Sequence, residues 1–163
     1  MCPKRSELKE KVMKYANDRL IKKYCHQMNI SENRAEVAFT ELKKFLFICG
    51  VTNEALTPSR RLDEIWHQFI LFTGDYMRFC SKFFGRMIHH RPDVDFTPRT
   101  KEVNDMAYER AYSIATDEFG ELDPEFWMSP HLVDTAKCNN SESETAKCSN
   151  EKVETGKNIY VEV

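Results

Sequence analysis

The chain has 163 residues, which is enough for one domain with one hydrophobic core. Hydrophobic residues make up 41% and charged residues 31%, with only 5 Gly and 6 Pro, which favours a helical protein over a turn-rich β sandwich. The formal net charge of −2 and the lack of any long run of Lys and Arg argue against nucleic acid or an anionic membrane as a partner.

The N-terminal sequence lacks the apolar segment of a secretory signal, and no later stretch has the length and apolarity of a membrane span. We therefore expect a cytoplasmic protein. Its 6 cysteines form no CxxC pair and have no short zinc-site spacing, so we expect thiols in a reducing compartment. Cys49 and Cys80 fall where small core residues would fit.

Two helices are predicted before residue 51. Apolar residues recur at three- and four-residue steps from Ser6 to about Asn29, which predicts one helix. Ser31 is a favourable N-cap for a second helix, and Gly50 suits the left-handed cap at its C-terminal end. Residues 51–59 mix Thr, Asn and Pro without periodicity and are predicted to form a loop.

Helical spacing continues from Arg60 to Gly85 and would permit one long helix. We predict a break at Thr73 and Gly74 instead. Thr73 is a suitable N-cap, Asp75 would favour a first helical turn, and Gly inside a helix costs about 1 kcal/mol relative to Ala. The chain after Gly85 is predicted to be looped or extended.

The last long helix is predicted to begin with Thr97 as its N-cap and to end at Gly120, with a short turn at residues 123–127. Beyond residue 134 the sequence is rich in Ser, Glu, Asn and Lys, and TAKCNN is followed by the near-repeat TAKCSN. Such a composition buries too little apolar surface to offset the entropy cost of folding. The sequence therefore predicts an all-α protein, with a single compact bundle of about five helices over residues 1–134 and a disordered polar tail over residues 135–163.

Polar side chains with metal-binding chemistry gather in residues 63–92. His67 follows Asp63 by four positions, so the two side chains share one face of a helix, a spacing that metal sites use. The carboxylate could bind an ion directly or hold His67 in one tautomer. His89 and His90 offer further nitrogen ligands, but adjacent histidines point in different directions, so only one of them is expected to face the site.

These residues can share an ion only if the predicted break exists. In one straight helix over residues 60–84, His67 would lie about 25 Å from the helix end, whereas five extended residues span about 18 Å at most. A break lets the two helices fold back on each other. The fold-back would bring His67, Tyr76 and one of His89 and His90 into one pocket, with a divalent metal ion as its cofactor and Trp66 and Tyr76 as further cofactor-binding candidates.

A structural interpretation competes with the metal site. A histidine beside Trp66 on a buried face is often a hydrogen-bonded core residue, and Asp63 could cap the helix or hold that imidazole. The ExxH of Glu64 and His67 occurs once, whereas carboxylate-bridged di-iron bundles need it twice. The chain also lacks GxSxG, a glycine-rich phosphate loop and HExxH, which leaves no enzyme class favoured by a motif.

Residues 58–92 read PSRRLDEIWHQFILFTGDYMRFCSKFFGRMIHHRP and contain D-x-x-W-H followed by Tyr, Gly and His. This pattern resembles the N-terminal conserved region of the glycine-rich domain-containing proteins of plants and their shorter bacterial relatives. A later run, YERAYSIATDEFGELDPEFW, is similar to the closing element of that region. The resemblance implies an all-helical domain without an assigned reaction. The chain has only 5 Gly, so these 163 residues contain no glycine-rich segment.

Two hypotheses follow. In the first, the helical domain binds a metal ion or small ligand through Asp63, His67 and one of His89 and His90, with hydrolytic or redox chemistry at an open coordination position. In the second, the domain is a non-enzymatic interaction module with a protein partner, and the Trp66–His67 cluster belongs to its core.

Overall fold

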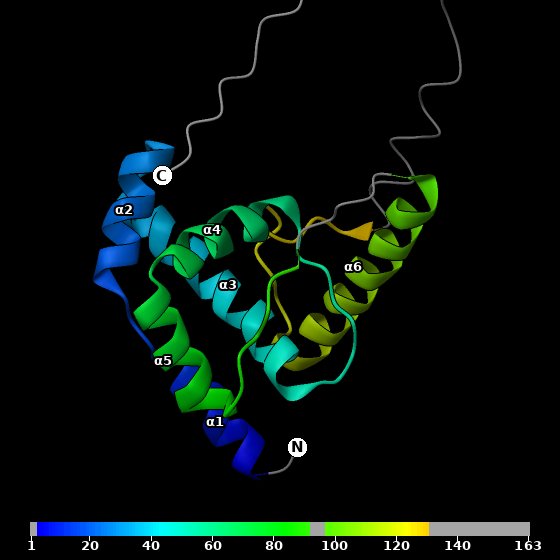
Figure 1. Ribbon diagram of the computed structural model, residues 1–163, viewed down its shortest axis with the longest axis horizontal. Coiled ribbons are helices and arrows are strands. Elements are labelled where there is room, and N and C mark those ends of the chain that lie inside the picture. Colours follow the sequence, from blue (N-terminus) through cyan, green and yellow to red (C-terminus); the bar gives the residue numbers. More distant parts are fainter. Residues whose placement is uncertain (1–2, 92–96, 131–163) are drawn as a thin grey trace, which may run out of the picture.

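The computed structural model describes residues 3–91 and 97–130, and within these ranges the chain forms helices and no strands (Figure 1). The helices are α1 (Pro3–Met13), α2 (Asp18–Met28), α3 (Glu32–Val51), α4 (Arg60–Leu71), α5 (Thr73–Phe84) and α6 (Pro98–Phe119). The predicted all-α bundle is confirmed, with one helix more than expected. The predicted boundary at residue 134 and the predicted tail lie outside the described residues.

The prediction of one helix up to Asn29 is wrong, because α1 and α2 are separated by a turn. Asn17 caps α2 by accepting a hydrogen bond from the Leu20 backbone N–H (3.0 Å). Lys43 on α3 donates to the backbone carbonyls of Met13 (2.6 Å) and Tyr15 (3.0 Å), at and just beyond the end of α1. Both helices bury apolar residues in the same core, so the apolar period continues across the turn.

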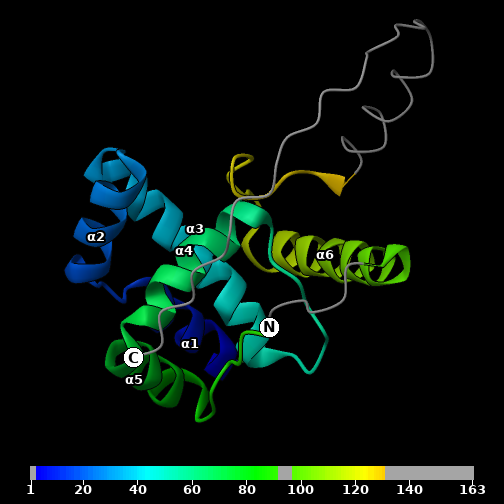
Figure 2. The ribbon, with the colours of Figure 1, turned by 45° about the horizontal axis from the view of Figure 1, so that its top comes forward.

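Helix α3 lies in the middle of the bundle and contacts each of the other five helices (Figures 1 and 2). Ser31 is its N-cap, as predicted, and accepts a hydrogen bond from the Arg34 backbone N–H (3.3 Å). The predicted C-terminal cap at Gly50 is wrong, because α3 continues to Val51 and Gly50 lies inside the helix. A Cβ at Gly50 would come 2.3 Å from a ring carbon of Phe84. Glycine is therefore needed there so that the end of α5 can pack against α3.

The predicted break between α4 and α5 is confirmed, but it lies at Phe72. This residue has φ −83° and ψ 60°, outside the helical region. Thr73 is not the predicted N-cap, because it is already the first residue of α5, which begins without a side-chain cap. Gly74 lies in the first turn of α5 and does not have a positive φ. The two helices contact each other across the break.

Helix α6 and the turn that follows it cover another part of α3. Thr97 caps α6, as predicted, by accepting a hydrogen bond from the Thr100 backbone N–H (3.4 Å), and Gly120 ends the helix. The predicted turn at residues 123–127 is present and buries Trp127, whose indole N–H donates to Glu41 on α3 (3.0 Å). In the part of the chain that the structure describes, no helix is long and apolar enough to span a bilayer.

The helical conformation of Gly74 leads to a test of the break. Gly74→Ala is expected to stabilise the domain, by about 1 kcal/mol at most, because Ala is the better helix former. The added Cβ would meet only the tip of the Arg78 side chain, at 3.4 Å, which can move. Gly85→Ala is the contrasting variant, because Gly85 has φ 65°, and we expect it to lose about 1 kcal/mol. Urea denaturation measures the free energy of unfolding of both variants. An equal loss of stability in the two would show that the break requires Gly74.

Candidate functional site

Helix α4 carries a buried aromatic residue beside a polar pair, of which one member is exposed and the other half-buried. Trp66 is 5% exposed, whereas the side chains of His67 and Asp63 are 52% and 33% exposed. Ser59 caps the helix by accepting a hydrogen bond from the Leu62 backbone N–H (3.2 Å), which fixes the turn that carries Asp63. His67 Nδ1 lies 3.4 Å from Asp63 Oδ2, as the four-residue spacing predicts.

Two buried hydrogen bonds tie the segment after α5 to α4. The Trp66 indole N–H donates to the Tyr76 hydroxyl oxygen (3.0 Å), and the Tyr76 hydroxyl donates to the Ile88 backbone carbonyl (2.5 Å). All three residues are buried. Gly85 ends α5 in the left-handed conformation, and the chain then turns back. Residues 86–91 consequently run beside α4, and in the view of Figure 1 they pass in front of α3.

His90 lies two residues beyond Ile88 and contacts Asp63. Its Nε2 is 2.6 Å from Asp63 Oδ1, and its ring centroid is 4.6 Å from that of Trp66 and 4.5 Å from that of His67. One ligand atom from each of Asp63, His67 and His90 lies within 4.8 Å of the other two. The predicted approach of His67 to one of the two adjacent histidines is confirmed.

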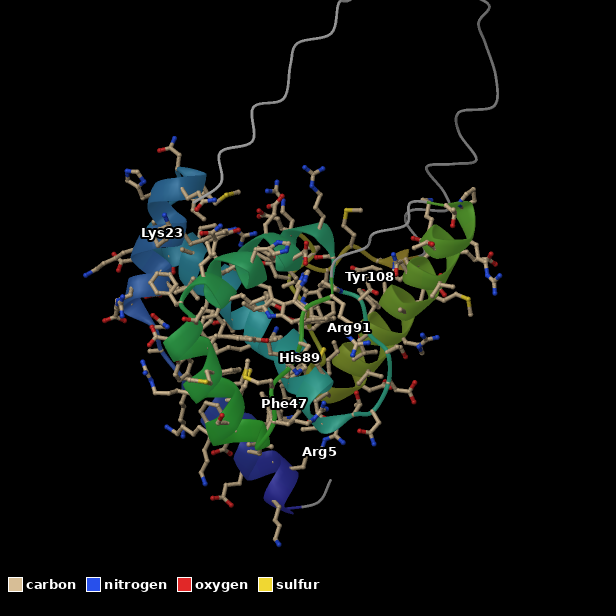
Figure 3. All side chains as sticks on the ribbon, viewed as in Figure 1. Arg5, Lys23, Phe47, His89, Arg91 and Tyr108 are labelled. Atoms are coloured by element: carbon tan, nitrogen blue, oxygen red, sulfur yellow. The ribbon has the colours of Figure 1, made fainter. Side chains whose placement is uncertain are left out.

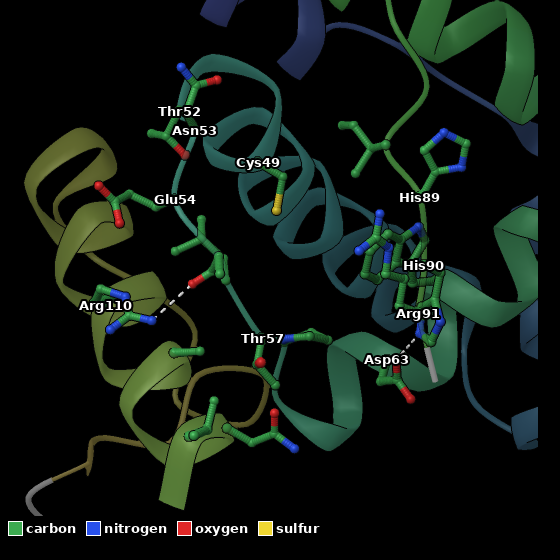
Figure 4. Close-up of a pocket in the computed structure, with 18 of the residues that line it drawn as sticks. Cys49, Thr52, Asn53, Glu54, Thr57, Asp63, His89, His90, Arg91 and Arg110 are labelled. Carbon is green, nitrogen blue, oxygen red and sulfur yellow. Dashed lines mark hydrogen bonds and ion pairs between the residues drawn. The ribbon is translucent and has the colours of Figure 1, made fainter. Parts of the chain in front are cut away.

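His89 lies outside this group. Its side chain is exposed, and Figure 4 shows its ring pointing away from Asp63. Figure 3 shows His89 and Arg91 on the segment that lies between α5 and α6 in that view. The structure therefore brings His90, rather than His89, to the candidate metal ligands.

Burial sets the protonation states of the groups around the site. It raises the pKa of the Tyr76 hydroxyl well above its usual range, so this group keeps the proton that it donates to Ile88. Burial also raises the pKa of the Cys49 thiol to about 12 and that of Cys80 above its usual value. Both cysteines remain thiols near neutral pH, which disfavours them as metal ligands because the thiolate is the form that binds.

Asp63, His67 and His90 line part of an open cavity of about 860 Å³ (Figure 4). The loop over residues 52–58 forms a second wall, and residues 86–91 form a third. A face of α6 supplies the remaining wall through Val103, Asn104, Ala107 and Arg110. Cavities of this size accommodate small organic molecules.

Two contributors to this region were missed by the sequence analysis. The Ile88 carbonyl is a backbone group, so no side-chain pattern signals it. Arg110 lies on α6, far from the Asp63 motif in sequence, and it reaches the cavity because α6 packs against α3. Its basic side chain on a helix would ordinarily predict a solvated surface position.

The sequence of the chain matches the family model described as UCP032817-like over residues 7–132. The chain belongs to the UCP032817-like family. The matched range contains every residue of the candidate site, but the family description names no activity. No curated protein matches the chain, and neither does any solved structure.

The Tyr76 hydroxyl can be tested by deletion in this UCP032817-like domain. Tyr76→Phe is expected to lower the free energy of unfolding by about 2 kcal/mol or more, because the buried Trp66 N–H and Ile88 carbonyl lose their partner. Tyr112→Phe is the matched control, since the Tyr112 hydroxyl has no hydrogen-bond partner among the described residues. We expect it to change stability by less than about 0.5 kcal/mol. Urea denaturation compares the two, and equal effects would contradict a positioning role for Tyr76.

Proposed function

We propose that this domain binds a divalent transition-metal ion through Asp63, His67 and His90, with open coordination positions facing the cavity. The observation that carries the proposal is the convergence of three ligand atoms, within 4.8 Å of one another, from α4 and from the segment after α5. Two imidazoles and one carboxylate form the protein ligand sets of catalytic zinc and non-haem iron sites. A set of three leaves room for water or substrate, whereas structural zinc sites use four ligands.

The Asp63 carboxylate lies between the two imidazoles. One oxygen faces His90 Nε2 at 2.6 Å, and the other faces His67 Nδ1 at 3.4 Å. An ion bound among these atoms would replace hydrogen bonds with coordination bonds, which requires neutral imidazoles and an ionised carboxylate. Protons would therefore compete with the ion, so affinity should fall as the pH is lowered. An open position on the ion could polarise a bound substrate or lower the pKa of a bound water.

Trp66 and Tyr76 act in this proposal as positioning residues. The Trp66 ring packs edge-on against the His90 ring, at 4.6 Å between centroids, and Tyr76 fixes the backbone at Ile88. Residues that orient a metal ligand without binding the ion themselves typically change metal affinity by about 10- to 100-fold. The two residues thus contribute to a cofactor site without touching the ion.

A protein-interaction module is the second candidate function. Val103 and Met106 on α6 are 56% and 52% exposed, and Met128 is 58% exposed, which is the kind of apolar surface that a protein partner can cover. In this case the contacts of Asp63 with His67 and His90 would be only structural ion pairs beside the core. A measurement of metal binding separates the two functions.

The relation to the glycine-rich domain-containing proteins is also a proposal, supported by the motif that runs from Asp63 to His90. The extent of the domain to residue 134 and a cytoplasmic location are proposals as well. Cys25, Cys49 and Cys80 are free thiols, which agrees with a reducing compartment.

The metal site is tested on the full chain, purified without a His tag and stripped with a chelator. We expect the wild type to take up about one Zn²⁺ or Co²⁺ per chain, measured by elemental analysis and by the Co²⁺ absorption spectrum. Asp63→Asn and His90→Asn should each lower the affinity by about 100-fold or more, because loss of an outer partner alone costs about 10- to 100-fold. His89→Asn is the matched control and should bind like the wild type.

Thermal unfolding provides a second readout and shows that the variants fold. The added ion should raise the melting temperature of the wild type and of His89→Asn but not that of His90→Asn. If the wild type takes up no ion, or if His90→Asn binds as tightly as His89→Asn, the metal site is wrong and the interaction module is the better proposal.

A further inference from the structure

We propose that the cavity beside the metal site receives a small organic anion, whose acid group is held by Arg110 and Arg86. This inference rests on the proposed function, because it names the class of molecule that would occupy the open side of that site. Carboxylates and phosphates share the chemistry required, since both present several oxygen atoms to the fork of N–H groups on a guanidinium.

The charge of the cavity lining differs in sign from that of the whole chain. The chain has a formal net charge of −2. The described residues that line the cavity include four arginines and two carboxylates, namely Arg60, Arg86, Arg91, Arg110, Glu54 and Asp63. The lining is therefore positive, and a bound divalent ion would add to this charge. A concave site whose lining has a net positive charge concentrates anionic ligands.

Three of these arginines lack a carboxylate partner among the described residues. Arg60 forms an ion pair with Glu64, with 3.5 Å between Nε and Oε1. Arg86, Arg91 and Arg110 form none within residues 3–91 and 97–130. A cation that faces a cavity without a counter-ion is available to an anionic ligand, and that ligand need not displace an existing ion pair.

Backbone carbonyls hold two of the unpaired guanidinium groups in place. Arg86 Nη2 donates to the carbonyls of Cys49 (2.9 Å) and Thr52 (3.2 Å), and Arg110 Nη2 donates to the carbonyl of Ala55 (3.3 Å; Figure 4). Each guanidinium has five N–H donors, so donors remain for a ligand. This arrangement lowers the entropy cost of ordering the two side chains when an anion binds.

Arg110 lines the cavity. Its Nε–H is enclosed by the protein and has no hydrogen-bond acceptor among the described residues. A ligand oxygen would therefore bind to the Nη groups of this guanidinium, of which one N–H already donates to the Ala55 carbonyl. Arg110 and the three metal-site residues line the same cavity of about 860 Å³, a volume suited to a small molecule rather than to a polymer.

The experiment is calorimetric titration of the full chain, in chelator-treated and zinc-loaded forms, with inorganic phosphate, succinate and uncharged succinamide. We expect phosphate or succinate to bind and succinamide not to bind, and the preferred anion identifies the ligand as a phosphate or a carboxylate. Arg110→Gln should weaken anion binding by about tenfold or more, as expected for hydrogen bonds between charged groups. Arg99→Gln is the matched control, since Arg99 is exposed on the same helix and lies outside the cavity lining.

The outcomes distinguish this inference from the metal site. A zinc-loaded chain that binds neither anion, or equal affinities in Arg110→Gln and Arg99→Gln, would overturn the anion site alone. Zinc analysis of the same samples reports on the metal site separately, and a chain that takes up no zinc overturns the proposed function. Circular dichroism tests the fold of Arg110→Gln. If that variant unfolds, Arg86→Gln takes its place, with the same expected loss of affinity.

Discussion

The geometry of the candidate site depends on the hydroxyl group of Tyr76. This group is buried and therefore needs partners, which it finds in the Trp66 indole N–H and the Ile88 carbonyl. Trp66 lies on α4, Tyr76 on α5 and Ile88 on the segment that follows, so one oxygen atom joins three parts of the chain. His90 reaches Asp63 because these two hydrogen bonds fix the path of the backbone just before it.

The same hydrogen bonds require the break at Phe72. In a continuous helix, Trp66 and Tyr76 would be separated by about 15 Å along the axis and could not form a hydrogen bond. With α4 and α5 folded against each other, the ring of Phe69 also packs edge-on against that of Tyr76, at 5.2 Å between centroids. Asn17 adds a further tie to the start of α5, through a hydrogen bond from its amide to Asp75 (3.2 Å). The break at Phe72 thus allows the hydrogen bonds of Tyr76, and these hydrogen bonds position the site.

Features that depend on neighbouring residues in the sequence could be predicted, whereas features that depend on packing could not. Ser31 and Thr97 cap their helices as expected, because a cap needs only a side chain and a backbone N–H three residues later. The break between α4 and α5 was predicted, but at Thr73 rather than at Phe72, where no residue type signals it. Gly50 was assigned to a helix end, although its role is to make room for Phe84, a tertiary contact. The place of Arg110 beside the site depends in the same way on how α6 packs.

The position of His67 favours a metal site over a simple ion pair. His90, whose side chain is 14% exposed, already forms a hydrogen bond with Asp63 at 2.6 Å. His67 adds a contact of 3.4 Å from a side chain that is 52% exposed, and such exposed pairs contribute little to stability. The fold therefore gains little from a second imidazole beside this carboxylate, whereas an ion gains a third ligand. The His90 ring packs against that of Trp66, whereas the more exposed His67 would be free to complete the coordination of an ion from the solvent side.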